Sequence, residues 1–160
     1  MAVDMFLKLG DVKGEAQDAK HKDEIDVLAW SWGLSQSGST HLGPGGGAGK
    51  VSVQDISVTK YVDAASPNLV KFCCTGKHFD NAVLTVRKAG DKPLEYIKLT
   101  MKEVLISSIS TGGSGGEDRL TENLTLNFAS FKLEYTPQKA DGSPGSAIEA
   151  LWDIPKNAEK

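Results

Sequence analysis

The three histidines of this chain, His21, His41 and His78, are the side chains best suited to binding a metal ion or moving a proton. They occur singly, and no two of them have the HxH, HExxH or HxxxH spacing that brings two imidazoles to one metal. The sequence therefore predicts histidines of the surface or of loops, and no metal site.

Nucleophilic chemistry has little support either. Cys73 and Cys74 are neighbours, so they make neither a disulfide framework nor a spaced metal knuckle, and they fit a reducing compartment during folding. We interpret them as small apolar packing groups, with thiol chemistry as the lesser alternative. No G-x-S-x-G elbow is present, and no motif pairs a serine or cysteine with histidine. We expect no enzyme and no cofactor.

Two carboxylates could share one face of a strand. Glu24 and Asp26 flank Ile25, and general acid and base pairs need such proximity. Solvated charge at a sheet edge is the favoured alternative, because such charges also protect edges from unwanted pairing.

The glycine-rich run Gly43–Lys50 invites comparison with a phosphate-binding loop, whose glycines expose backbone N–H groups to phosphate before a helix. The comparison fails, since Pro44 replaces the first required glycine and Val51 replaces the required serine or threonine. The residues that follow alternate as a strand does. The run is therefore interpreted as a flexible connection in a hairpin.

Length and charge limit the classes of protein. A chain of 160 residues and 17.1 kDa is the size of one domain, so we expect a single domain over 1–160 with no additional C-terminal domain. A net charge of −3 argues against nucleic acid as a partner. Asp4 and Lys8 interrupt the first apolar stretch, and the long uncharged stretch Val27–Gly49 is polar in its second half. We expect no signal peptide and no membrane insertion.

Period-2 alternation dominates the chain and predicts a mainly β fold, with two antiparallel sheets forming a β-barrel or sandwich. The expected strands are Ala2–Leu9, Glu24–Leu34, Val51–Thr59 with a bulge, Ala82–Lys88, Leu94–Glu103, Val104–Ser110, Leu124–Phe128, Phe131–Tyr135 and Ile148–Trp152. One short flanking α-helix is expected at about residues 67–75, with Ser66 as N-cap, Pro67 in the first helical position and Gly76 in the left-handed position at its end.

The predicted strand Glu24–Leu34 has two unlike faces. One carries Leu28, Trp30, Trp32 and Leu34 and must be core or interface. The other face carries Ile25 and Val27, followed by Ala29, Ser31 and Gly33. These last three side chains are small, so another part of the protein or another molecule can approach the strand closely there. Packing against another element and contact with a cargo remain equally open there.

Several long strings, in one order, resemble the Hcp family, the tube proteins of the bacterial type VI secretion system. The most specific are Glu24–Gly33, Gly49–Asp55 and Gly112–Glu122, and the resemblance covers nearly the whole chain. It implies hexameric rings that stack into a hollow tube driven out by a contractile sheath. It also implies a secreted, non-catalytic protein, made in the cytoplasm, that meets the sheath and spike proteins and carries small effectors in its lumen.

Physical reasoning is compatible with such a ring, because identical neighbours in a closed ring bury the edge strands of a sandwich. Within a tube, we expect Ala29, Ser31 and Gly33 to line the lumen. The hairpin tip at Gly90 and Asp91 forms a rim turn. The expected ring-stacking loop consists of Gln36, Ser37, Gly38, Ser39, Thr40, His41, Leu42, Gly43, Pro44, Gly45, Gly46, Gly47, Ala48, Gly49 and Lys50.

A competing hypothesis is a monomeric β-sandwich that binds a ligand such as a carbohydrate. Trp30 or Trp32 would then offer the ring on which the ligand stacks. The mass in dilute solution separates the two hypotheses, since a tube subunit forms a hexamer and a binding module does not.

Overall fold

The computed structural model describes residues 2–37, 50–90 and 92–159. About half of these residues lie in strands, and one segment is an α-helix. The elements are β1 (Val3–Leu9), β2 (Ile25–Asp26), β3 (Ala29–Ser31), β4 (Leu34–Ser35), β5 (Ser52–Val53), β6 (Ile56–Tyr61), α1 (Ser66–Thr75), β7 (His78–Lys88), β8 (Leu94–Thr111), β9 (Thr121–Asn127), β10 (Ser130–Tyr135) and β11 (Ile148–Asp153).

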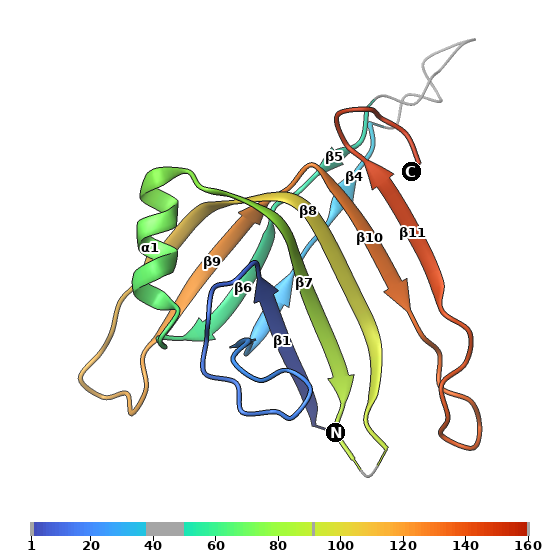
Figure 1. The fold of residues 1–160 in the computed structure, drawn as a ribbon, viewed down its shortest axis with the longest axis horizontal. Coiled ribbons are helices and arrows are strands. Elements are labelled where there is room, and N and C mark those ends of the chain that lie inside the picture. Colours follow the sequence, from blue (N-terminus) through green and yellow to red (C-terminus); the bar gives the residue numbers. More distant parts are fainter. Residues whose placement is uncertain (1, 38–49, 91, 160) are drawn as a thin grey trace.

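The strands form two antiparallel sheets, so the predicted fold class is confirmed (Figure 1). Nine strands follow the order β2-β1-β7-β8-β9-β6-β3, with β10 paired to β8 and β11 to β10, while β4 and β5 form a separate pair. Among the described strands, β2 pairs only with β1 and β3 only with β6, so the ladder is not continuous around a barrel.

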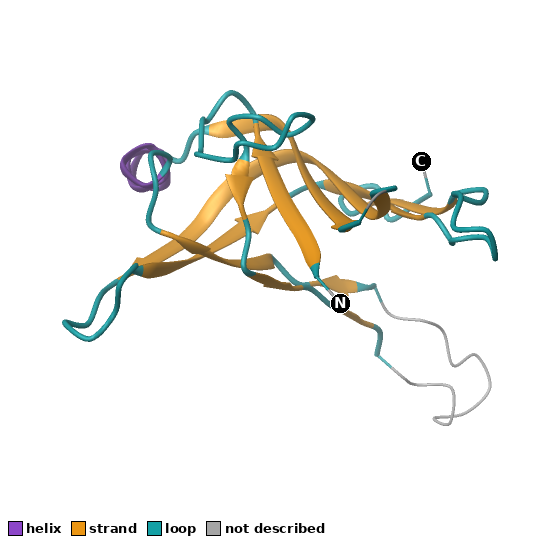
Figure 2. Ribbon diagram, turned by 90° about the horizontal axis from the view of Figure 1, so that it is seen from below, coloured by secondary structure: helices purple, strands orange, loops and turns teal. Residues whose placement is uncertain are grey.

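One hydrophobic core lies between the layers of the large sheet, which Figure 2 shows from below. Alternate residues of each strand point inward, as period-2 alternation requires. The fully buried leucines of the core come from both layers, and they include Leu7, Leu84, Leu99, Leu124 and Leu126. The helix α1 lies beside the sheets, on the side away from β10 and β11 (Figure 1).

The expected strand 24–34 is wrong as a single element, because the chain crosses between layers in its middle. Val27 donates its N–H to Met5 of β1, whereas Leu28 donates to Thr59 of β6. The crossing changes the phase of the alternation. Ile25 and Val27 are buried before it, and Trp30 points inward after it.

Two other predictions gave the wrong number of strands. The expected strand 51–59 is two strands, β5 and β6, separated at the place where a bulge was expected. The segments expected as separate strands at 94–103 and 104–110 are one strand, β8. Glu103, where the predicted division falls, has a φ of 52° in the left-handed region, so the irregularity is real but does not end the strand.

The helix is confirmed, with a change at its first turn. Ala65 is the N-cap, and Ser66 is already helical. The Ser66 hydroxyl accepts the N–H of Asp63 and donates to Glu122, so it is used between elements and does not cap the helix. Gly76 ends the helix with a φ of 66°, a left-handed conformation that costs glycine little.

A charged cluster lies inside the protein where α1 meets β6 and β9. Lys60 and Glu122 are 0% and 2% exposed and form an ion pair. The Lys60 ammonium also lies 3.0 Å from Asp63 Oδ1, and the Ser66 hydroxyl donates to Glu122 Oε1 at 2.5 Å. Every charge of this cluster therefore has a partner, as burial demands.

Within residues 2–37, 50–90 and 92–159, no helix combines the length and the apolar character that crossing a bilayer requires.

Candidate functional site

Eight small, uncharged side chains lie together on the outer face of four neighbouring strands, with Tyr61 of β6 beyond them on the same face. Two rows cross β3, β6, β9 and β8 in register, Ala29, Thr59, Asn123 and Ser110 in one, and Ser31, Ser57, Thr125 and Ser108 in the other. All eight are exposed or half-buried. We call this set the hydroxyl face.

Four polar groups of the hydroxyl face form two hydrogen-bonded pairs. Thr59 Oγ1 donates to Asn123 Oδ1 at 2.8 Å, and the Thr125 hydroxyl lies 2.5 Å from that of Ser108. Hydroxyls both donate and accept, so these pairs need no charged partner, and Ser107, 2.7 Å from Thr125 Oγ1, links them to Asp55 at the end of the face. Inward residues of the same strands, Val58 and Leu124, are fully buried in the core. The face is therefore a firm, neutral surface on a packed wall.

Two of the three residues expected at a lumen lie on this face. Ala29 and Ser31 are exposed in β3. Gly33 follows the end of β3 and lies outside the two rows. A Cβ atom placed on Gly33 would lie 3.2 Å from the Gln54 side chain, so Gly33 faces that side chain closely.

The tryptophans point the other way. Trp30 and Trp32 pack against the core, and Trp32 Nε1 donates to the backbone oxygen of Gln54 at 2.9 Å. The Trp32 ring also meets the Phe131 ring edge-on, with centroids 4.9 Å apart. Neither ring is therefore a free platform for a sugar, which removes the observation that motivated the binding-module hypothesis.

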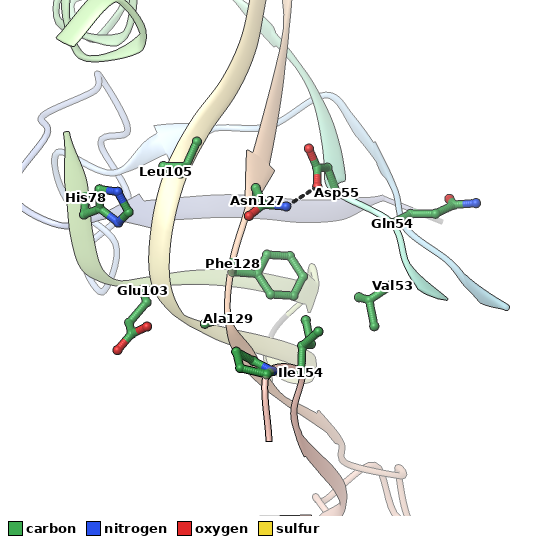
Figure 3. Close-up of a pocket in the computed structure, with 11 residues that line it drawn as sticks. Val53, Gln54, Asp55, His78, Glu103, Leu105, Asn127, Phe128, Ala129 and Ile154 are labelled. Atoms are coloured by element: carbon green, nitrogen blue, oxygen red, sulfur yellow. Dashed lines mark hydrogen bonds between the residues drawn. The ribbon is translucent and has the colours of Figure 1, made fainter. Parts of the chain in front are cut away.

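A hollow of about 330 Å³ lies at the end of the hydroxyl face where β9 turns into β10 (Figure 3). Asp55 lies in its lining and accepts hydrogen bonds from Asn127 Nδ2 at 2.8 Å and Ser107 Oγ at 2.6 Å. His78 and Glu103 lie across the hollow from Asp55. The carboxylate of Asp55 is thus already used in joining β6, β8 and β9.

Within the described residues, the carboxylates Glu24 and Asp26 and the two cysteines do not form a catalytic or metal-binding site. Glu24 binds His21, at 2.9 Å from Nδ1, and does not pair with Asp26. Burial of the Asp26 carboxyl is the main cause that raises its pKa, and the negative charge of nearby Asp63 is the second. Cys73 and Cys74 are free thiols. No group of three metal-ligating side chains occurs within 2–37, 50–90 and 92–159.

The prediction of surface or loop histidines is confirmed for the two described histidines. His78 is exposed, and His41 lies outside the described residues. His21 lies in a loop, but it is only 9% exposed and is not a surface residue. Its partner Glu24 is three residues away, but its other partner, Glu95, is 74 residues away, and sequence spacing gave no signal for it.

The expected ring-stacking loop falls mostly outside the described residues. Gln36, Ser37 and Lys50 are exposed at its two ends, and 38–49 are not described. At the expected rim turn, Gly90 has a φ of 144°, which favours glycine, and Asp91 is not described.

The far end of β10 and β11 carries an apolar surface. Tyr135 and Ile148 are opposite each other in register and are 48% and 67% exposed. Half-buried Leu133 and Ile97 lie beside them on the same face. Ala158 bridges β11 at Asp153, and among the described strands β11 otherwise pairs only with β10.

Comparisons with known proteins agree with one another. The model of the family described as "Type VI secretion system effector, Hcp" matches residues 6–135. Protein hcp1 of Pseudomonas aeruginosa is 62% identical over 161 residues, covering 99% of each chain. The crystal structure of Hcp1 from Salmonella typhimurium is similar with a TM-score of 0.83 and 41% identity, covering 100% of both chains. A structure described as that of a type six secretion system protein has a TM-score of 0.92 and 32% identity over 99% of this chain and 100% of its own.

Proposed function

This chain belongs to the Hcp family of the type VI secretion system, the secreted tube proteins of that apparatus, and we propose that it forms hexameric rings that stack into the inner tube. In this proposal its role is geometric and needs no cofactor. Its further partners are the sheath and spike proteins and small effector proteins held in the lumen.

The hydroxyl face is the observation that carries the proposal. A lumen wall must let a folded protein pass without trapping it, and fixed charges or large apolar patches would hold particular cargoes strongly. The eight residues of the hydroxyl face offer neither, because their side chains are small and uncharged, and four of them are already bonded in pairs. We assign Ala29 and Ser31 to the lumen wall on this ground.

Self-association has its own support. The edge of β11 beside exposed Tyr135 and Ile148 can pair with another chain, and it is covered when identical subunits close a ring. Stacking of rings is assigned to the segment 36–50 and to the rim turn at Gly90 and Asp91. Ordering a glycine-rich segment costs conformational entropy, so stacking is expected to be weaker than contact within the ring.

Electron microscopy and native mass measurement test the ring. The purified protein should form rings with about six times the subunit mass of 17.1 kDa. Ile148→Glu should dissociate them, because it places a charge in the proposed contact. Val70→Glu, at an exposed apolar residue of α1, is the matched control and should leave rings intact. A single subunit at every concentration tested would overturn the ring.

The lumen assignment has a separate test. Ser31→Arg should abolish retention of a co-expressed effector by rings that still form, because six arginines would crowd the wall. Ser114→Arg, at an exposed serine outside the hydroxyl face, should retain the effector. Equal retention by both variants would remove Ser31 from the lumen.

A further inference from the structure

Residues 10–24 form a strap that doubles back on itself across the sheet. Gly14 donates its N–H to Asp23 at 2.8 Å, and Asp23 donates in return to Ala16 at 2.9 Å. A Cβ atom on Gly14 would lie 2.5 Å from the backbone oxygen of Glu24, so the two arms of the strap touch at a position that only glycine fits. The strap is therefore a defined structure and not a loose loop.

Apolar side chains lie beneath the strap. Val12 and Ala16 are 8% and 2% exposed, and Phe6 of β1 is 4% exposed. The His21 ring stacks on the Phe6 ring with centroids 4.5 Å apart and an angle of 11° between the planes. Lifting the strap would expose these residues to water.

Both ring nitrogens of His21 face carboxylates. Nδ1 lies 2.9 Å from Glu24 Oε2, and Nε2 lies 2.6 Å from Glu95 Oε1 on β8. An ionised carboxylate only accepts hydrogen bonds, and a neutral imidazole has one N–H. Both contacts are made together only when the ring carries two protons and a positive charge.

The surroundings of His21 are also charged on the elements packed against it. Arg87 of β7 lies over the Phe6 ring and binds Asp18 of the strap and Asp4 of β1. Lys20 and Lys22 of the strap are exposed. Glu24 and Glu95 are the only carboxylates that the described structure places within hydrogen-bond distance of the His21 ring.

We propose that His21 is a proton-dependent latch, which holds the strap closed on β8 while its ring is doubly protonated and releases it when one proton is lost. The neutral ring keeps one donor, so one carboxylate faces a lone pair and is repelled. Glu24 belongs to the end of the strap and Glu95 to the sheet, so the latch opens when the remaining proton stays on Nδ1, facing Glu24, and Nε2 loses its contact with Glu95. The strap is also tied by Asp18 to Arg87, and by Glu15 Oε2 to the N–H of Ala64 at 2.8 Å, so release is local and leaves the fold intact.

Amide hydrogen exchange of the whole protein tests the latch. Exchange is corrected for its intrinsic pH dependence and compared at the N–H groups of Ala16 and Asp23, with Leu126 in the core as reference. From about pH 6 to about pH 9, strap protection should fall roughly 10-fold to 100-fold relative to Leu126, the effect of losing one charge-assisted hydrogen bond. The nitrogen chemical shifts of the His21 ring should change from the values of a ring with two protonated nitrogens to those of a ring with one. The pH midpoint of this change should equal the midpoint of the loss of strap protection.

Variants separate the latch from a merely structural role. Glu95→Gln should make strap protection nearly independent of pH, because an amide offers a partner to either ring form. His78→Gln, at an exposed histidine outside the strap, should keep the wild-type dependence. Unchanged relative protection in the wild type, different midpoints for ring and strap, or a wild-type pH dependence in Glu95→Gln would each overturn the latch.

Discussion

Two charged clusters hold this molecule together in different ways. The first joins Lys60, Asp63 and Glu122 beneath α1, where Lys60 and Glu122 are closed off from solvent. The second joins the strap to the sheet through Asp18 with Arg87 and His21 with Glu95. Here the partners reach the surface, since the side chain of Glu95 is 38% exposed and that of Asp18 is 23% exposed.

The difference teaches what burial does to a charge. Inside, a charge that loses its partner has no water to replace it, so the cluster is either complete or costly. In the outer cluster, water solvates a charge when its partner leaves, so the contacts of that cluster break one at a time. The inner cluster therefore fixes the fold, and the outer one controls a local opening.

The largest effect is expected for Lys60→Met, which leaves Glu122 buried without its cation. The free energy of unfolding should fall by roughly 3–5 kcal/mol, as when one member of a buried ion pair is removed. Urea unfolding at one fixed protein concentration measures it, because association also shifts stability.

The double variant Lys60→Met with Glu122→Leu is the control for that measurement. It removes both charges and should recover most of the lost stability. If Lys60→Met alone costs less than about 1 kcal/mol, the value of an exposed pair, the inner cluster behaves as the outer one does and the comparison fails.

A smaller, local effect is expected in acid at Asp18. The hydrogen bond from Arg87 lowers the pKa of Asp18 from 3.8 to about 2, against an opposing contribution from burial. A lowered pKa means that the carboxylate's contribution is complete above about pH 4 and is lost as the pH falls through about 2. Exchange at Ala16 and Asp23 should therefore accelerate over this range relative to Leu126.

Asp18→Asn isolates this contribution from those of other carboxylates. Its strap should already exchange faster at about pH 4, and it should change less than the wild type as the pH falls to about 2. Identical acid profiles for the two proteins would show that Asp18 does not fasten the strap.

The strands and the helix were predictable from local pattern. Alternation in Val3–Leu9 and Thr121–Asn127 reflects one buried and one exposed face, and the sequence shows it directly. Crossing between layers at Val27 and Leu28 was not predictable, because Ile25, Val27 and Trp30 are all apolar and fit either phase. Only the pairing partners of β2 and β3 decide it.

The candidate site was predictable in part. Small residues at Ala29 and Ser31 indicated an open face, but the hydroxyl face needs three further strands that only the register brings together. The charged clusters were missed for the same reason. His21 and Glu95 are 74 residues apart, and Lys60 and Glu122 are 62 apart, so no local spacing joins them.

The length of β8 has a mechanical consequence. Its first part pairs with β7 and β10, and its second part pairs with β9, so one uninterrupted backbone runs through both layers. A pull applied to one layer reaches the other through covalent bonds, and the load does not have to cross side-chain contacts. For a protein of a family that is fired from cells, that arrangement resists shear where a sandwich of two separate sheets would slide.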